Sequence, residues 1–202
     1  MNMIPESNSI EDYVLEADEV DFKHHAIQEL AAELFALSSN EADFVRRAYE
    51  YVRDEISHSW DIQSSRITCK ASEALHYKEG ICYAKSNLLC ALLRSNGVPT
   101  GFCYQRLTLG DTPDTGYCIH ALNAVYLTSV ERWIRLDARG NKAGIHAEFS
   151  LDEEKLAFAI RTEYDEIDYP IIYTAPNPKT MDTLKKHTDC KAMYLHGLPC
   201  EL

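Results

Sequence analysis

The sequence predicts an α+β fold, in which a helical N-terminal half with a buried central helix packs on an antiparallel β-sheet. In the first half of the chain, apolar residues recur at the three- and four-residue spacing of amphipathic helices. Residues 82–95 are apolar on nearly every side, which is typical of a helix buried in the core. After Pro99 the pattern changes to runs rich in Tyr, Val, Ile, Leu and Thr, which are typical of strands.

The helical half begins with two amphipathic helices. Residues 25–37 carry apolar side chains at helical spacing and end at a polar Ser-Ser-Asn turn. Asn40 is well placed to cap the next helix, whose acidic first turn suits the helix dipole. Residues 57–69 are irregular and polar. Residues 71–77 predict a short helix that stops near Gly80.

The central helix is expected over residues 82–95, because Gly97 is a natural left-handed stop and Pro99 lies just beyond it. Three strands are predicted after it, over residues 99–109, 117–127 and 131–137. The Gly- and Asp-rich segment 110–116 predicts a turn between the first two strands. The sheet is therefore expected to be antiparallel.

The two ends of the chain are less clearly patterned. Residues 1–20 are acidic and predict a loose arm or a short helix. Near the C-terminus, residues 151–160 predict a helix, residues 169–173 an extended segment, and residues 178–187 a final helix.

Composition narrows the classes of function. The chain has 202 residues and a formal net charge of −12, which disfavours binding to nucleic-acid phosphates or to an anionic membrane surface. No stretch approaches the roughly 18 apolar residues of a membrane span. The acidic first residues do not form a secretory signal, and the seven irregularly spaced cysteines suit reduced thiols. We therefore expect a cytoplasmic protein.

Three residue types that cysteine chemistry needs occur at informative positions. Cys82 begins the central helix, where unpaired N–H groups favour thiolate over thiol, and the thiolate is the nucleophile. His120 lies in the second predicted strand and Asp137 ends the third. They are candidates for a nucleophile, a general base and an orienting acid.

Each candidate also has a purely structural interpretation. Most cysteines are small buried hydrophobic residues, and Cys90 is such a case within the same helix. Asp137 could cap the turn that follows its strand. The histidines that compete with His120 for the role of base are His58, His76 and His146.

The order Cys82, His120, Asp137, with Gly80 just before the thiol and Trp133 shortly before the aspartate, resembles the transglutaminase-like core of the papain-type cysteine enzyme superfamily. The resemblance covers residues 66–150. It implies a nucleophile helix lying against the sheet that presents His and Asp. We accordingly expect a single domain over residues 1–202, in which residues 1–20 form the acidic arm and residues 151–202 a C-terminal extension of this core.

The resemblance further implies a cofactor-free cysteine enzyme that attacks the amide carbonyl of a peptide or other amide substrate. The acyl-thioester would be resolved by water, as in a protease or amidase, or by an amine, as in a transglutaminase. An oxyanion hole would be needed, with the backbone N–H of Cys82 as first donor. Four side chains are available for the second donor, namely Trp60, Gln63, Ser65 and Gln105. Gly80 would allow close approach of substrate and an unusual dihedral angle.

Two alternatives remain open at the level of sequence. Cys118 and His120 share a strand face and Cys103 could join them as metal ligands, but no Cys-x-x-Cys or His-x-x-x-His pair occurs, so we expect no metal. A non-catalytic scaffold of the same fold could instead bind a protein partner through its acidic surface. The presence of all three candidate residues speaks against this scaffold hypothesis. The sequence gives no prediction of oligomeric state.

Overall fold

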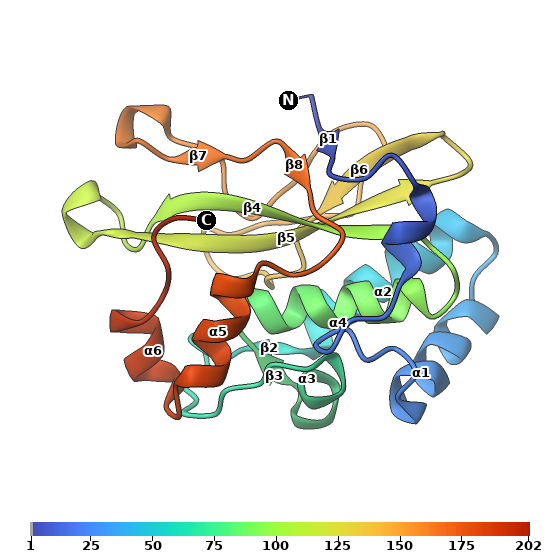
Figure 1. Cartoon of the computed structure of the whole chain (residues 1–202), viewed down its shortest axis with the longest axis horizontal. Helices are drawn as coiled ribbons and strands as arrows, with labels where there is room; N and C mark the ends of the chain where they lie inside the picture. Colours follow the sequence, from blue (N-terminus) through green and yellow to red (C-terminus); the bar gives the residue numbers. More distant parts are fainter. Residues whose placement is uncertain (1) are drawn as a thin grey trace.

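A computed structural model describes residues 2–202, and residue 1 lies outside this range. A layer of helices packs under a four-stranded antiparallel sheet, as Figure 1 shows. The strand order is β6-β5-β4-β7, with the bounds β4 Thr100–Thr108, β5 Tyr117–Leu127, β6 Arg132–Leu136 and β7 Ile167–Asp168. The predicted α+β class is therefore confirmed.

The N-terminal helices follow the sequence expectations closely. Their bounds are α1 His25–Ala36, α2 Glu41–Glu55, α3 Ala71–Tyr77 and α4 Cys82–Arg94. Asn40 caps α2, because its side-chain oxygen accepts from the N–H of Asp43 at 3.0 Å. Gly97 adopts the expected left-handed conformation after α4, with φ of +74°.

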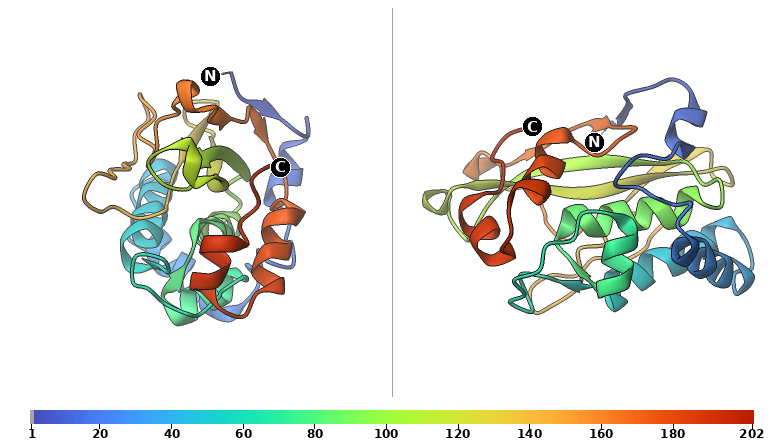
Figure 2. Two further views of the ribbon diagram at one scale, coloured as in Figure 1. Left: turned by 90° about the vertical axis from the view of Figure 1, so that its left-hand side faces the viewer. Right: turned by 60° about the horizontal axis from the view of Figure 1, so that its bottom comes forward.

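Short elements complete the chain between and after these helices. They are β1 Ile4–Pro5, η1 Ile10–Val14, β2 Ser57–His58, β3 Glu79–Gly80, η2 Pro113–Thr115, η3 Thr162–Tyr164, β8 Ile171–Ile172, α5 Pro178–Lys186 and α6 Cys190–His196. The C-terminal helices α5 and α6 pack at the end of the helical layer where α4 begins (Figures 1 and 2). None of the helices described in residues 2–202 is long and apolar enough to cross a membrane.

Every residue of α4 is buried, so the helix runs through the core. Leu88, Leu89 and Leu92 are fully enclosed. On the strand side, the side chain of Asn123 donates to the carbonyl of Ser86 at 3.2 Å and joins β5 to the helix. Cys82, at the first position of α4, is thus fixed with respect to the sheet.

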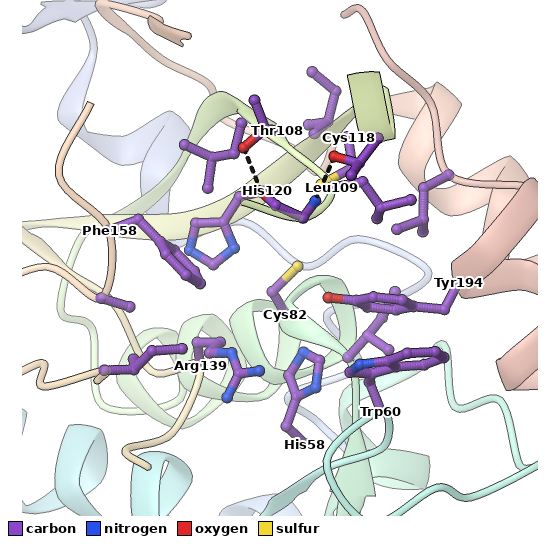
Figure 3. Close-up of a pocket in the computed structure, with 18 of the residues that line it drawn as sticks. His58, Trp60, Cys82, Thr108, Leu109, Cys118, His120, Arg139, Phe158 and Tyr194 are labelled. Carbon is purple, nitrogen blue, oxygen red and sulfur yellow. Dashed lines mark hydrogen bonds between the residues drawn. The ribbon is translucent and has the colours of Figure 1, made fainter. Parts of the chain in front are cut away.

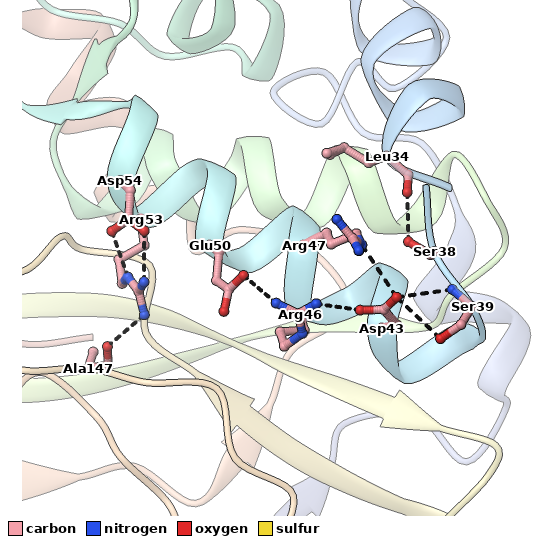
Figure 4. A network of polar contacts seen from close by, with 10 residues as sticks. All are labelled: Leu34, Ser38, Ser39, Asp43, Arg46, Arg47, Glu50, Arg53, Asp54 and Ala147. Atoms are coloured by element: carbon pink, nitrogen blue, oxygen red, sulfur yellow. Dashed lines mark hydrogen bonds and ion pairs between the residues drawn. The ribbon is translucent and has the colours of Figure 1, made fainter. Parts of the chain in front are cut away.

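Helix α2 packs beside α4 and carries a row of charged side chains, shown in Figure 4. Arg46 bridges Asp43 at 2.5 Å and Glu50 at 2.6 Å, which are the three- and four-residue neighbours on one helix face. Arg53 donates to the carbonyl of Ala147 at 3.0 Å. This last contact attaches α2 to the segment that follows β6.

Of the two alternatives expected for residues 1–20, the short helix is present as η1, whereas the loose arm is wrong, because the described part of this segment is docked on the rest of the protein. The N–H of Ile4 donates to the carbonyl of Pro170 at 2.8 Å, and β1 pairs in parallel with β8. Tyr13 is 1% exposed and its hydroxyl donates to the carbonyl of Ile172 at 3.0 Å. The sheet face opposite α4 needs an apolar cover, and this segment supplies part of it.

The helix expected over residues 151–160 is also absent from the described structure, where the segment is irregular. The N–H of Ala157 donates to the carboxylate of Asp137 at 3.1 Å, so this backbone is committed to a tertiary contact. The helix expected over residues 178–187 is confirmed as α5, whereas α6 was not anticipated from the sequence.

Burial predicts that replacing two different cysteines changes the free energy of unfolding by different amounts. Cys90 is fully buried in α4, whereas Cys200 is exposed. Cys90→Ala should lower the free energy of unfolding by about 1 kcal/mol, because it removes packed atoms and leaves a small cavity. Cys200→Ala should change it by less than about 0.5 kcal/mol. Urea unfolding measures both values, and equal effects would contradict this assignment of the core.

Candidate active site

Cys82 stands at the start of α4 because the preceding chain is held by a short parallel ladder. Strands β2 and β3 pair so that His58 lies opposite Gly80. A Cβ on Gly80 would lie 2.9 Å from both the Cβ of Ala84 and the hydroxyl oxygen of Thr68. Glycine is therefore required for close packing against α4. The expectation of an unusual dihedral angle at Gly80 is wrong, because its φ is not positive. Gly80 also does not line the cavity described next, so it is not placed to approach a substrate there.

Cys82 lines a cavity of about 720 Å³. The walls come from the loop after β2, the start of α4, the facing ends of β4 and β5, the segment after β6, and α6. Figure 3 shows the cavity, with the Cys82 sulfur near its centre and His120 directed toward it from β5. Both candidate residues therefore face one cavity.

His120 and Asp137 form a hydrogen-bonded pair. The Nε2 of His120 donates to Oδ2 of Asp137 at 2.8 Å, which leaves Nδ1 for Cys82. Strand β6 ends at Leu136, which pairs with Asn123, so the part of β5 that carries His120 has no strand neighbour on this side. Other parts of the chain border this edge of β5: the N–H of Ile119 donates to the carbonyl of Pro199 at 2.8 Å, and the carbonyl of Ile119 accepts from the hydroxyl of Tyr83 at 2.8 Å.

The electrostatics of the pair favour its charged form. Burial by itself would lower the pKa of His120, but the Asp137 carboxylate and the Cys82 thiolate outweigh it and raise this pKa to about 10. Burial would likewise raise the pKa of Asp137, yet His120 and backbone N–H groups hold it below its ordinary value. An imidazolium at His120 beside the Asp137 carboxylate is thus the stable arrangement.

Asp137 is itself fixed by the chain around it. Its carboxylate accepts from the N–H of Arg139 at 3.2 Å and from the N–H of Ala157 at 3.1 Å. The Phe158 ring meets the His120 ring edge-on, with centroids 5.0 Å apart. The turn-capping interpretation and the His-orienting interpretation of Asp137 are therefore both satisfied by the same carboxylate.

Of the three rival histidines, only His58 lines the cavity. It is 5% exposed, and burial together with the positive charge of Arg139 holds its pKa well below its ordinary value. Its Nδ1 has no partner among the described residues. His76 and His146 are exposed and lie outside the cavity. His120 is the histidine that pairs with a carboxylate, as a base of this type requires.

The candidate oxyanion donors are dispersed. The N–H of Cys82 belongs to the first turn of α4, where backbone N–H groups lack helical acceptors. Trp60 lines the cavity. Gln63 is exposed and donates to the Trp60 carbonyl at 2.6 Å, and Ser65 uses its carbonyl to accept from Cys190 at 2.8 Å. Gln105 is buried in β4 opposite His120 and does not line the cavity.

Two features of the cavity were not anticipated from the sequence. Arg139 pairs with Asp61, which also accepts from Lys142 at 2.7 Å. Burial would raise the pKa of Asp61, but its two cationic partners lower it to about 2. The second feature is Tyr194 of α6, whose ring stacks on Trp60 with centroids 4.4 Å apart. Arg139 follows Asp137 by two residues, so the sequence could have indicated that it lies near the site. Nothing in the sequence linked Tyr194 to Cys82.

Comparison with solved structures places this fold among known ones. A candidate cysteine protease from Cytophaga hutchinsonii matches with a TM-score of 0.53 and 18% identity, over 66% of this chain and 43% of that one. The periplasmic domain of TgpA from Pseudomonas aeruginosa matches with a TM-score of 0.46 and 13% identity, over 62% and 45%. The chain thus spans less than half the length of these matched structures. At such identities the likeness concerns the fold alone.

Among curated proteins, none matches this sequence significantly. The sequence does match the model of the transglutaminase-like superfamily over residues 28–138, which is more than half of the chain. The matched region runs from α1 to the residue after Asp137, and so includes Cys82, His120 and Asp137. The chain belongs to the transglutaminase-like superfamily.

Proposed function

We propose that this protein is a cysteine enzyme that acts on amide bonds of a peptide or other amide substrate through an acyl-thioester at Cys82. The observation that supports this proposal most strongly is the convergence of Cys82 and the His120–Asp137 pair on one cavity. Each residue has the partner that its role requires: a helix N-terminus for the thiolate, a thiol for the imidazole and an imidazole for the carboxylate.

In the proposed reaction, the Cys82 sulfur attacks the amide carbonyl carbon, and the carbonyl π electrons move to oxygen. When the carbonyl re-forms, the carbon–nitrogen bond breaks and the leaving amine takes a proton from the His120 imidazolium. Water or a second amine then attacks the thioester, with neutral His120 accepting its proton. Cys82 leaves as thiolate, and the starting charge state returns.

The alternative is a non-catalytic scaffold that binds a protein partner. A scaffold has no need of a buried imidazolium between a thiol and a carboxylate, since burying a charge is costly unless it is paired. The arrangement around His120 therefore favours the enzyme over the scaffold.

An activated ester tests thioester formation without knowledge of the natural amide. Incubation with p-nitrophenyl acetate should release p-nitrophenolate and leave one acetyl group on Cys82, located by peptide mass spectrometry. Cys82→Ala should abolish this reaction. Cys90→Ala removes a thiol from the same helix and should retain the acylation rate within about twofold, because Cys90 is buried away from the cavity.

Equal labelling of several cysteines, or labelling that survives Cys82→Ala, would support the scaffold. Addition of methylamine to the acylated protein then distinguishes the two fates of the thioester. N-methylacetamide is expected from amine transfer, and acetate from hydrolysis.

The charge state of His120 predicts a pH-dependent contribution to stability. Because the folded pKa of His120 is raised to about 10, from an ordinary value of about 6.5, the stabilisation is fully present below the ordinary pKa. It should be lost as the pH rises through the folded pKa. The difference in free energy of unfolding between the wild type and His120→Gln should therefore decrease between about pH 6.5 and pH 10.

Urea unfolding at pH 6.5, 8 and 9.5 measures this difference. Lys85, whose pKa is lowered to about 7 chiefly by burial, titrates in both proteins, so its effect largely cancels in the comparison. A difference that stays constant over this range would show that His120 is not held as an imidazolium.

A further inference from the structure

We propose that Tyr194, on the C-terminal helix α6, is a catalytic residue that donates a hydrogen bond to the carbonyl oxygen of the acyl group bound at Cys82. The inference rests on the proposed function, because it assigns the second oxyanion donor for the same reaction. Tyr194 lies outside residues 28–138, the region matched to the superfamily. It is therefore a contribution of this chain's C-terminal segment to the site.

The Tyr194 ring has a defined place in the cavity wall. It stacks on Trp60 with an interplanar angle of 12° and meets the edge of His58 with centroids 6.1 Å apart. Figure 3 shows its hydroxyl directed toward Cys82, with His120 on the other side of the sulfur in this view. An acyl group on the sulfur would thus lie between an imidazole and a phenol.

The hydroxyl of Tyr194 is available as a donor. It makes no hydrogen bond to any residue described in the range 2–202, in contrast to the buried Tyr83 and Tyr13, whose hydroxyls donate to backbone carbonyls. Burial, and then the negative charge of the Cys82 thiolate, raise the pKa of Tyr194 above its ordinary value. The phenol therefore keeps its proton at neutral pH, as an oxyanion donor must.

Helix α6 is anchored at its start and again just after its end, so the hydroxyl of Tyr194 is held in position. At its start, the N–H of Cys190 donates to the Ser65 carbonyl at 2.8 Å. After its end, the Pro199 carbonyl accepts from the N–H of Ile119 at 2.8 Å, directly beside His120. A donor fixed before reaction is the kind that stabilises a transition state, because little reorganisation is needed.

The expected chemistry assigns each group one task. When the Cys82 sulfur bonds to the carbonyl carbon, the π electrons move to oxygen and form an oxyanion. The hydroxyl of Tyr194 and the N–H of Cys82 donate to this oxygen. Both hydrogen bonds weaken when the carbonyl re-forms and the leaving group departs.

Two reactions of the Cys82 thiol show whether Tyr194 acts as an oxyanion donor or affects the thiol in some other way. Acylation by p-nitrophenyl acetate passes through an oxyanion, whereas alkylation by iodoacetamide displaces iodide and forms none. In Tyr194→Phe, acylation should therefore slow by about tenfold to 100-fold, as expected for loss of one hydrogen bond to a charged oxygen, while alkylation stays within about twofold. Phenylalanine keeps the ring that stacks on Trp60.

The control is Tyr13→Phe, which removes a hydroxyl from the opposite sheet face and should change neither rate. Both rates are measured on one preparation, so any loss of folded protein lowers them together and leaves their ratio unchanged. An unchanged ratio in Tyr194→Phe would overturn the proposal. A rise in both rates would also overturn it, because the tyrosine would then shield the thiol. Absence of Cys82-dependent acylation in the wild type would instead overturn the proposed function itself.

Discussion

The complete burial of α4 is the constraint on which the rest of the structure depends. The polar side chains of a helix enclosed on all sides can form hydrogen bonds only within the protein, and several of those on α4 join it to its neighbours. Arg94 donates to the carbonyls of Thr100 at 3.0 Å and Thr174 at 2.6 Å. Asn87 donates to the carbonyl of Cys69 at 2.8 Å. The helix cannot slide or rotate without breaking these bonds.

The consequence appears at the first residue of α4. Lys85, one turn after Cys82, donates to the carbonyl of Ile56 and, at 3.3 Å, to that of Arg53, where α2 ends. Tyr83 donates to the carbonyl of Ile119 at 2.8 Å, next to His120. The core packing that stabilises the protein thereby also fixes the distance between the thiol and the imidazole.

Local sequence signals were sufficient to predict this central part of the fold. The apolar run of α4, the Asn40 cap and the Gly97 stop are local signals, and the strand that carries His120 and the strand before Asp137 are rich in strand-forming residues. The ends of the chain could not be predicted in the same way. Tyr13, Ala157 and Tyr194 take their places through contacts with residues far away in the chain, and no local pattern encodes such partners.

The same distinction applies to the candidate site. Cys82, His120 and Asp137 were identified from residue type and element, and the structure brings all three together. The second oxyanion donor could not be chosen by that reasoning, because it depends on which side chains converge in space. Gln105 is a polar residue of β4 that lies opposite His120, yet it is buried away from the cavity.

The central claim is that His120 is held as an imidazolium between Cys82 and Asp137. Nitrogen-15 NMR of the histidine rings at pH 8 tests it most directly, since the two ring nitrogens report their protonation separately. With a pKa of about 10, His120 should carry protons on both nitrogens, while His58 should be neutral. A His120 ring with a single proton at pH 8 would contradict the account.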